Sequence, residues 1–214
     1  MPALLFDLDG TMLNSDALHE AIFKDILEER GVVLGDNWYQ QKIHGRLNAD
    51  IFADLLPELR DPEALSVEKE AEFRRRLPVP YPSLPGLAAL LEDCATWPKA
   101  VVTNAPRLNA EAMLRAIGVR EAFDVLVIGD ECAKGKPDPE PYLEAMRQLG
   151  VRAEDCVAFE DSPSGLRAAR DSGAYSVGVR STLDDAALRR AGAQCSIQDF
   201  EDTALADVLT SLKE

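Results

Sequence analysis

The sequence lacks long apolar runs and paired cysteines, and both absences narrow its class. No window approaches the length of a membrane-spanning segment, and the N-terminal residues show no basic segment leading into an apolar stretch and a cleavage site. We therefore expect a cytoplasmic protein. Cys94, Cys132, Cys156 and Cys195 are scattered, without the spacing typical of zinc sites or redox dithiols, so we expect reduced and mainly buried thiols.

Basic residues are too few to balance the acidic ones. The chain has 23 Lys and Arg against 38 Asp and Glu, which gives a formal net charge of -15. Nucleic acids and anionic membranes would repel such a protein over a Debye length of about 8 Å at physiological salt, so neither is an expected partner. At 214 residues and 46% hydrophobic, the chain can bury one sizeable core and a small second lobe. We expect a monomer or a homodimer.

Most of the chain alternates between short apolar segments and amphipathic ones. This rhythm predicts an α/β fold, with a parallel sheet covered on both faces in a Rossmann-like three-layer core. The expected strands are 3–6, 100–103, 125–128, 157–159 and 176–179, with an edge strand near 195–197 and a closing helix. The expected helices between them are 108–117, 139–149 and 164–172, each followed shortly by a glycine.

The rhythm is interrupted between residues 15 and 82, where no strand pattern occurs. Helical patterns recur there at 17–29, 49–55 and 62–77, which predicts a helical lobe inserted after the first strand. The proline cluster LPVPYPSLPG marks the return, because each proline fixes its own backbone angle and restrains the residue before it. The expected domains are thus residues 1–14 with 83–214, and residues 15–82.

Asp7 and Asp9 place two carboxylates at the end of the first apolar segment, ALLFDLDGT. Side chains two apart on an extended strand share a face, so both carboxylates point one way. Two such charges about 5 Å apart repel by roughly 3 kcal/mol at an effective dielectric constant near 20, so they favour a cation or a shared proton. The pair indicates a metal-assisted active site.

Polar groups also follow the second and third expected strands. Thr103 and Asn104 end the segment KAVVTNAP, where a hydroxyl and a backbone N–H can bind phosphate oxygens; alternatively, Thr103 only ends a strand and Asn104 caps the next helix. Lys136 lies in GKPDPEPYLEAM, ahead of a helix that Asp138 can cap. Its ammonium can sit between a carboxylate and a phosphate, although most lysines are solvated surface residues.

A second acidic pair, Glu160 and Asp161, follows the fourth expected strand in CVAFEDSPSGLRAA. Ser162 is the expected cap of the next helix and Pro163 its first residue. A helix dipole favours negative charge there by about 0.3–1 kcal/mol, which explains one carboxylate better than two. Oxygen ligands from Asp7, Asp9 and Asp161 suit Mg²⁺.

Four segments, FDLDGT, VVTNAP, GKPDP and FEDSPSG, resemble in order and separation the signature motifs of the haloacid dehalogenase superfamily, phosphatase branch. The helical segment 15–82 resembles the cap of the branch whose lid follows the first motif. The resemblance implies that Asp7 is the nucleophile and Asp9 the acid and base. It also implies that Thr103 and the Asn104 backbone hold the phosphoryl oxygens, while Lys136 steadies Asp7 and the phosphate.

The same resemblance implies a Mg²⁺ site formed by the side chains of Asp161, Glu160 and Asp7 with the main-chain carbonyl of Asp9. The expected activity is a Mg²⁺-dependent phosphatase of a small phosphorylated metabolite, of the sugar phosphate, phosphoglycolate or nucleotide type. The alternative is a β-phosphoglucomutase-like enzyme that transfers the phosphoryl group to a hexose phosphate. An aspartate at position 9 argues against dehalogenation, which needs no acid for an alcohol leaving group, and no expected catalytic position is missing, which disfavours a non-catalytic binding protein.

Substrate specificity is expected to come from polar residues outside these motifs. The candidates for substrate binding are His19, His44, Arg46 and Arg107, with IHGR as a cap loop. Arg46 is a candidate for binding a second anionic group, although an arginine in an acidic protein is as often a surface residue.

Overall fold

The computed structural model describes residues 1–43 and 46–212. The described chain divides into two compact units, one formed by Met1–Asn14 with Val79–Glu214 and the other by Ser15–Pro78. The chain enters the smaller unit after Asn14, as expected. It leaves that unit after Pro78, four residues before the expected boundary at residue 82. Each unit has its own hydrophobic core.

The larger unit is built on a six-stranded sheet in which every neighbouring pair of strands is parallel, in the order β3-β2-β1-β4-β5-β6. The strands are β1 (Ala3–Phe6), β2 (Lys99–Thr103), β3 (Val125–Ile128), β4 (Cys156–Glu160), β5 (Tyr175–Val179) and β6 (Cys195–Ile197). β1, β2 and β4 are buried throughout because helices cover both faces of the sheet. The predicted α/β fold with a parallel sheet is confirmed.

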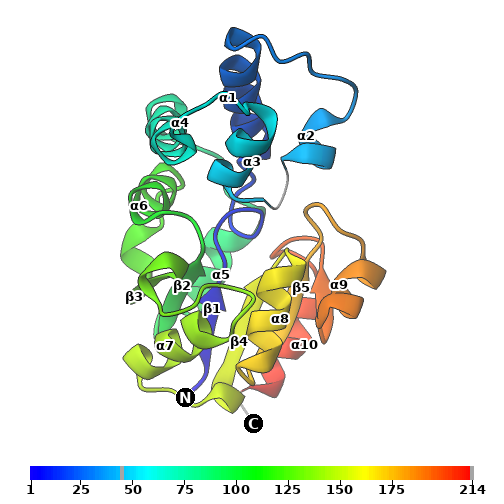
Figure 1. Ribbon diagram of the computed structural model, residues 1–214. Coiled ribbons are helices and arrows are strands. Elements are labelled where there is room, and N and C mark those ends of the chain that lie inside the picture. The colour runs from blue at the N-terminus through cyan, green and yellow to red at the C-terminus, as the bar shows by residue number, and fades with distance from the viewer. Residues whose placement is uncertain (44–45, 213–214) are drawn as a thin grey trace. The chain divides into compact units, whose positions relative to one another are not determined.

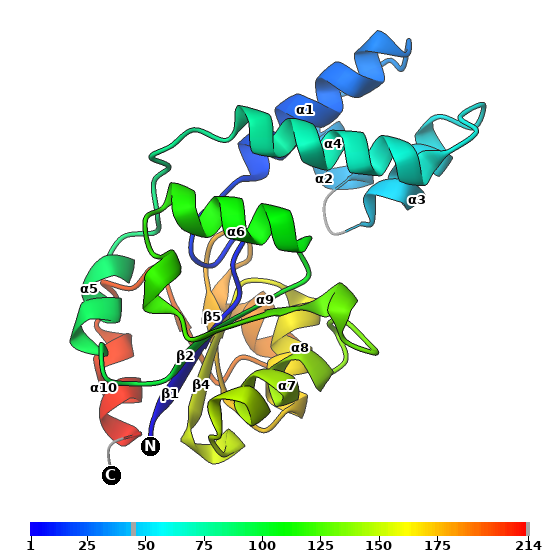
Figure 2. The same cartoon turned by 90° about the vertical axis from the view of Figure 1, so that its left-hand side faces the viewer.

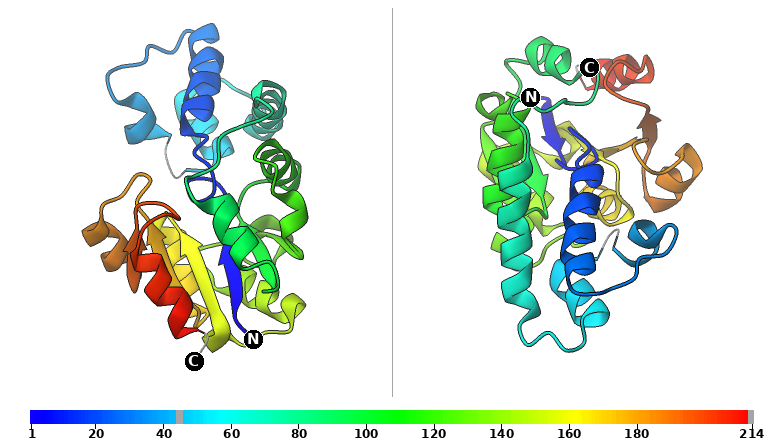
Figure 3. Two further views of the ribbon diagram at one scale, coloured as in Figure 1. Left: turned by 180° about the vertical axis from the view of Figure 1, so that it is seen from behind. Right: turned by 90° about the horizontal axis from the view of Figure 1, so that it is seen from above.

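Helices lie on both faces of this sheet (Figures 1 and 2). The helices of this unit are α5 (Leu87–Asp93), α6 (Arg107–Ala116), α7 (Glu140–Leu149), α8 (Pro163–Asp171), α9 (Asp185–Ala191) and α10 (Ala204–Ser211), with 3₁₀ turns at Arg120–Ala122, Gly129–Glu131 and Ala153–Asp155. Seen from behind, α5 and α10 lie in front of the sheet, on the face opposite α7 and α8 (Figure 3). Side chains of α7 and α8 pack on the strands in one core, whereas Phe6, Phe159 and Phe200 form an aromatic cluster on the other face.

Local sequence explains where several helices begin and end. Ser162 caps α8 as predicted, because its Oγ accepts a hydrogen bond from the N–H of Gly165 at 3.1 Å, with Pro163 as the first helical residue. Gly150 directly follows α7 and closes it, with a φ of 68°, the left-handed conformation that glycine adopts without strain. The sequence patterns missed α2, α5 and α9, each of seven residues or fewer.

The described residues of the smaller unit form helices joined by loops, with no strand. The helices are α1 (Asp16–Glu29), α2 (Trp38–Lys42), α3 (Asn48–Leu55) and α4 (Pro62–Arg76). Asp61 caps α4, because its Oδ1 accepts from the N–H of Ala64 at 2.9 Å. Phe23, Phe52 and Leu65 join α1, α3 and α4 in one apolar cluster, and α1 and α4 lie side by side in the view from above (Figure 3).

None of the helices described is both long and apolar enough to cross a membrane. Cys94, Cys132, Cys156 and Cys195 are not joined in disulfides; Cys94 and Cys156 are buried and the other two are partly buried.

Candidate active site

The four motif segments meet at the carboxyl edge of the sheet. Asp7 follows β1, Thr103 ends β2, Lys136 lies in the loop after β3 and Asp161 follows β4. Parallel strands end at a common edge, and the chain reverses its direction of strand addition between β1 and β4. Such a switch point opens a crevice at the carboxyl ends of the strands, where ligands of open α/β sheets bind.

Lys136 is the central cation of this edge. Its Nζ donates hydrogen bonds at 2.6 Å to each of three acceptors: Asp7 Oδ1, Glu160 Oε1 and the Val102 carbonyl. Burial disfavours the charged form, but the carboxylates of Asp7 and Glu160 outweigh it and raise the pKa of Lys136. The ammonium is therefore charged, with all three of its hydrogens engaged.

Negative charge nevertheless exceeds positive charge at this edge. Burial raises the pKa of Asp7 to about 7; Lys136 opposes that shift, while the charges of Glu160 and Asp9 add to it. Burial, followed by the charges of Asp7, Glu160 and Asp9, raises the pKa of Asp161 well above its ordinary value. Each of these carboxylates resists ionisation because it is buried and because its neighbours are also acidic, so the cluster favours a further cation.

Glu160 is fully buried, and both of its oxygens have donors. In addition to Lys136, the Tyr142 hydroxyl donates to Oε1 at 2.9 Å, and the Ser162 hydroxyl donates to Oε2 at 3.1 Å. Burial and the charge of Glu160 raise the pKa of Tyr142 well above its ordinary value, so the phenol keeps the proton that it donates. Gly165 leaves room for this carboxylate, because a Cβ there would lie 1.8 Å from Oε1.

Asp161 is held by hydroxyl groups. The Thr11 hydroxyl donates to its Oδ1 at 3.4 Å and the Ser181 hydroxyl to its Oδ2 at 3.3 Å. Gly10 has a φ of 84°, and a Cβ there would lie only 2.1 Å from Asp161 Oδ2. The turn after β1 thus needs glycine for its backbone conformation and for the close approach of Asp161.

The residues present fit a magnesium ion. Asp7, Glu160 and Asp161 each offer a carboxylate oxygen, and these oxygens lie within 4.8 Å of one another. Hard oxygen donors of this kind suit Mg²⁺, which is commonly bound through one or two carboxylates and keeps waters or substrate phosphate in its other positions. Asp7 and Asp161 offer it oxygens more readily than Glu160, whose oxygens already accept hydrogen bonds from Lys136, Tyr142 and both the hydroxyl and the N–H of Ser162.

Thr103 and Asn104 differ in what their side chains contact. Thr103 Oγ1 accepts a hydrogen bond from the N–H of Ala105 at 3.1 Å, so its own O–H remains available to donate. The Asn104 side chain contacts the main chain of Lys136 instead. It does not cap α6, which begins at Arg107 after Pro106 and has no side-chain cap.

The predicted substrate residues Arg107, Arg46 and His19 each contact a charged side chain of their own unit. Arg107 forms a two-point ion pair with Glu131, at 2.6 and 2.7 Å. In the helical unit, the Arg46 guanidinium contacts Asp54 at 3.2 Å, and His19 Nδ1 lies 2.7 Å from Lys69 Nζ. His44 lies outside the described residues.

Sequence reasoning did not identify Tyr142 or Ser181. Tyr142 follows the third motif segment, GKPDP, but nothing in its spacing indicates a contact with Glu160, 18 residues away. Ser181 could have been found, because it follows β5 and the carboxyl ends of all the strands lie at the same edge.

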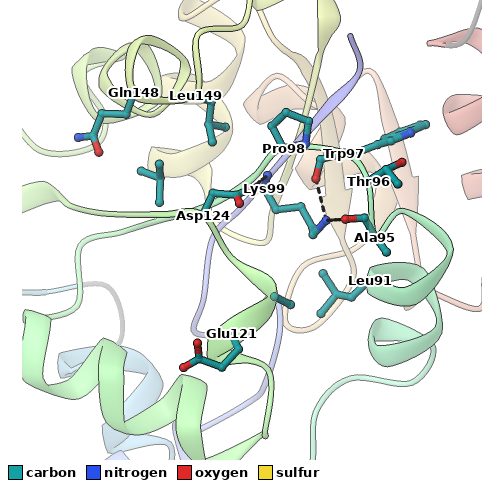
Figure 4. Close-up of a pocket in the computed structure, with 12 residues that line it drawn as sticks. Leu91, Ala95, Thr96, Trp97, Pro98, Lys99, Glu121, Asp124, Gln148 and Leu149 are labelled. Atoms are coloured by element: carbon teal, nitrogen blue, oxygen red, sulfur yellow. Dashed lines mark hydrogen bonds between the residues drawn. The ribbon is translucent and has the colours of Figure 1, made fainter.

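A cavity of about 660 Å³ lies elsewhere, at the amino ends of β2 and β3 (Figure 4). It is lined in part by Trp97, Lys99 and Asp124. The Lys99 ammonium has all its hydrogens engaged by carbonyls, those of Cys94, Ala95 and Trp97, at 2.8, 3.2 and 2.7 Å. These bonds tie β2 to the end of α5, so Lys99 is structural, and the cavity is on the edge away from the carboxylates.

Comparison with known proteins gives consistent matches. A model of haloacid dehalogenase-like hydrolases matches residues 1–173. A phosphorylated carbohydrates phosphatase of Thermotoga maritima is 32% identical over 227 residues, covering 100% of this chain and 99% of that protein. A fructose-1-phosphate phosphatase of Escherichia coli is 33% identical over 185 residues, covering 83% of this chain and 95% of that protein.

Solved structures show the same fold. A HAD hydrolase of family IA, variant 3, from Entamoeba histolytica superimposes with a TM-score of 0.87 and 26% identity, covering 100% of both chains. A candidate β-phosphoglucomutase from Thermotoga maritima superimposes with a TM-score of 0.79 and 28% identity, covering 99% of both chains.

Proposed function

Since the chain belongs to the haloacid dehalogenase-like hydrolase family and is a phosphoric monoester hydrolase, we propose that it is a Mg²⁺-dependent phosphatase of a small phosphorylated sugar that acts through an aspartyl-phosphate. The observation that carries this proposal is the 2.6 Å contact between Lys136 Nζ and Asp7 Oδ1 at the carboxyl edge of the sheet. It pairs a buried nucleophile with a fixed positive charge, which is what attack on an anionic ester requires.

In the proposed first step, a carboxylate oxygen of Asp7 forms a bond to phosphorus, and the bond from phosphorus to the ester oxygen breaks. Asp9 gives its proton to that leaving oxygen, so that an alcohol departs. In the second step, Asp9 takes a proton from water, whose oxygen attacks phosphorus and releases the Asp7 carboxylate. Free phosphate is the second product.

The remaining residues are proposed to bind the phosphoryl group and the metal ion. The Thr103 hydroxyl and the Asn104 backbone N–H are proposed donors to the phosphoryl oxygens, with Lys136 as a positive charge beside them. Asp7 and Asp161, with the Asp9 carbonyl, are the proposed holders of Mg²⁺, and Glu160 serves mainly to orient Lys136. When bound, the ion offsets the repulsion between the attacking carboxylate and the phosphate.

The helical unit is the proposed lid that excludes water during the reaction. Its polar side chains, among them Arg46 and His19, are the proposed contacts to the sugar. The names of the relatives favour a sugar phosphate over phosphoglycolate or a nucleotide, because two matching proteins are phosphatases of carbohydrates.

A single substitution tests the nucleophile. Asp7→Asn should abolish turnover of an aryl phosphate in the presence of Mg²⁺ while leaving the circular dichroism spectrum unchanged. Turnover at the wild-type rate would reject Asp7 as the nucleophile. A panel of hexose and pentose phosphates, assayed by phosphate release, would then identify the substrate.

The second candidate is a β-phosphoglucomutase-like transferase, favoured by the likeness to the candidate mutase structure from Thermotoga maritima. In that reaction the phosphoryl group on Asp7 passes to a sugar hydroxyl instead of water. The two candidates differ in product when a hexose 1-phosphate is supplied. Isomerised sugar phosphate without phosphate release would overturn the phosphatase proposal.

A further inference from the structure

The side chain of Asn104 forms a two-point contact with the main chain of Lys136, 32 residues away. The Lys136 N–H donates to Asn104 Oδ1 at 3.2 Å, and Asn104 Nδ2 donates to the Lys136 carbonyl at 3.3 Å. The side-chain amide thus pairs with both polar groups of one residue's backbone. Reversing the amide would place donor against donor and acceptor against acceptor, so the pairing also determines its orientation.

Two glycines make room for this contact. A Cβ at Gly129 would lie 2.1 Å from Asn104 Oδ1, and a Cβ at Gly135 would lie 3.2 Å from the same atom. Gly129 follows β3 and Gly135 directly precedes Lys136, so the loop that carries the lysine has small residues on both sides of the amide. Side chains at these positions would push the amide away from Lys136.

The same segment of β2 also contacts the other end of Lys136. The Val102 carbonyl accepts from Lys136 Nζ at 2.6 Å, two residues before Asn104. Val102–Asn104 therefore binds both the backbone and the ammonium of this lysine. A lysine side chain loses about 2 kcal/mol of rotamer entropy when held, so a fixed backbone lowers the further ordering needed to keep Nζ near Asp7.

We propose that Asn104 is a positioning residue, whose side chain fixes the backbone of Lys136 so that the ammonium stays 2.6 Å from the Asp7 carboxylate. This role differs from the backbone contact to phosphate proposed above, because it belongs to the side chain and acts through Lys136. Only the predicted effect of Asn104 on the reaction rate rests on the proposed phosphatase activity. The contact itself can be tested without activity.

A double-mutant cycle tests the effect on rate. Asn104→Ala should lower kcat for an aryl phosphate about 100-fold, the loss expected when a catalytic group shifts by about 1 Å. In a Lys136→Met background, the same substitution should change the residual rate less than twofold, since its effect passes through the lysine. Equal losses in both backgrounds would overturn the proposal. Asn109→Ala, a buried asparagine in α6, is the control for general destabilisation.

Hydrogen exchange tests the contact independently. Peptides covering residues 129–137 should exchange the Lys136 amide faster in Asn104→Ala, whereas Asn104→Asp, which keeps an acceptor oxygen, should preserve more of the protection. Unchanged exchange in Asn104→Ala would overturn the contact whatever the activity. If wild-type protein turned over no phosphate ester while the exchange result held, the proposed function would fail and the contact would stand.

Discussion

The ammonium of Lys136 and the carboxylate of Asp7 lie 2.6 Å apart, although 129 residues separate them in the chain. The sheet brings them together, because β1 lies beside β2, and β2 in turn lies beside β3, whose following loop carries the lysine. This pair is buried, so it affects both stability and the proposed chemistry.

Lys136→Met should therefore reduce both the stability of the fold and the rate of phosphate release. Removing one partner leaves Asp7 and Glu160 buried without their counter-ion, which typically lowers the free energy of unfolding by about 3–5 kcal/mol. Phosphate release should fall at least as strongly as in Asn104→Ala. Urea denaturation and an aryl phosphate assay measure the two effects. Lys134→Ala, on the same loop but exposed and paired with Asp138, is the matched control and should change neither.

Gly10→Ala should disturb Asp161 specifically. Gly10 and Gly31 have similar positive φ values of 84° and 78°, but only at Gly10 would a Cβ meet another atom, Asp161 Oδ2 at 2.1 Å. Both alanine variants should share a strain penalty of about 1–2 kcal/mol. Only Gly10→Ala should also lose activity and stabilisation by Mg²⁺. Identical behaviour of the two variants in thermal unfolding and turnover would contradict the close packing of Asp161 on the turn.

Mg²⁺ should stabilise the folded protein by binding to it in preference to the unfolded chain. At a concentration of 100 times the dissociation constant, the gain is about 2.7 kcal/mol, seen as a rise in Tm. Asp161→Asn should abolish most of that rise, and EDTA should stop turnover by the wild-type protein. Asp130→Asn removes one exposed negative charge and should keep the response. A rate unaffected by EDTA would rule out the metal requirement.

Stability of the metal-free protein should fall as pH rises from about 4 to about 7. Burial raises the pKa of Asp7 to about 7, so in this window the folded state holds a proton that the unfolded chain has already released. Bound protons favour the folded state, and this contribution disappears above the raised pKa. Asp161 is shifted in the same direction.

Urea denaturation in EDTA across this range measures the slope, and Asp7→Asn should make it shallower. A slope of opposite sign that disappears in Asp7→Asn would contradict this prediction. It would mean that the charge of Lys136 lowers the pKa of Asp7 more than burial raises it.

Local sequence determined the elements and the family. Strands 3–6, 125–128 and 195–197 were predicted at their observed bounds. Short apolar segments flanked by turn residues are typical of buried strands, because they are too short to form a helix. The four motif segments led to the family that the comparisons confirm. The family also accounts for the predicted class of enzyme, a phosphoric monoester hydrolase. Helices of five to seven residues escaped detection because they are too short to show a helical period.

Only the tertiary structure decided which partner each polar side chain takes. The sequence made Arg107 a candidate for substrate binding, and its ion pair with Glu131 became visible only in the structure. Tyr142 showed no signal in the sequence, yet it donates to Glu160, and Asn104 binds the backbone of Lys136. Such pairings depend on which strands become neighbours and on how closely the loops pack at their ends, and neither is encoded in the spacing of residues along the chain.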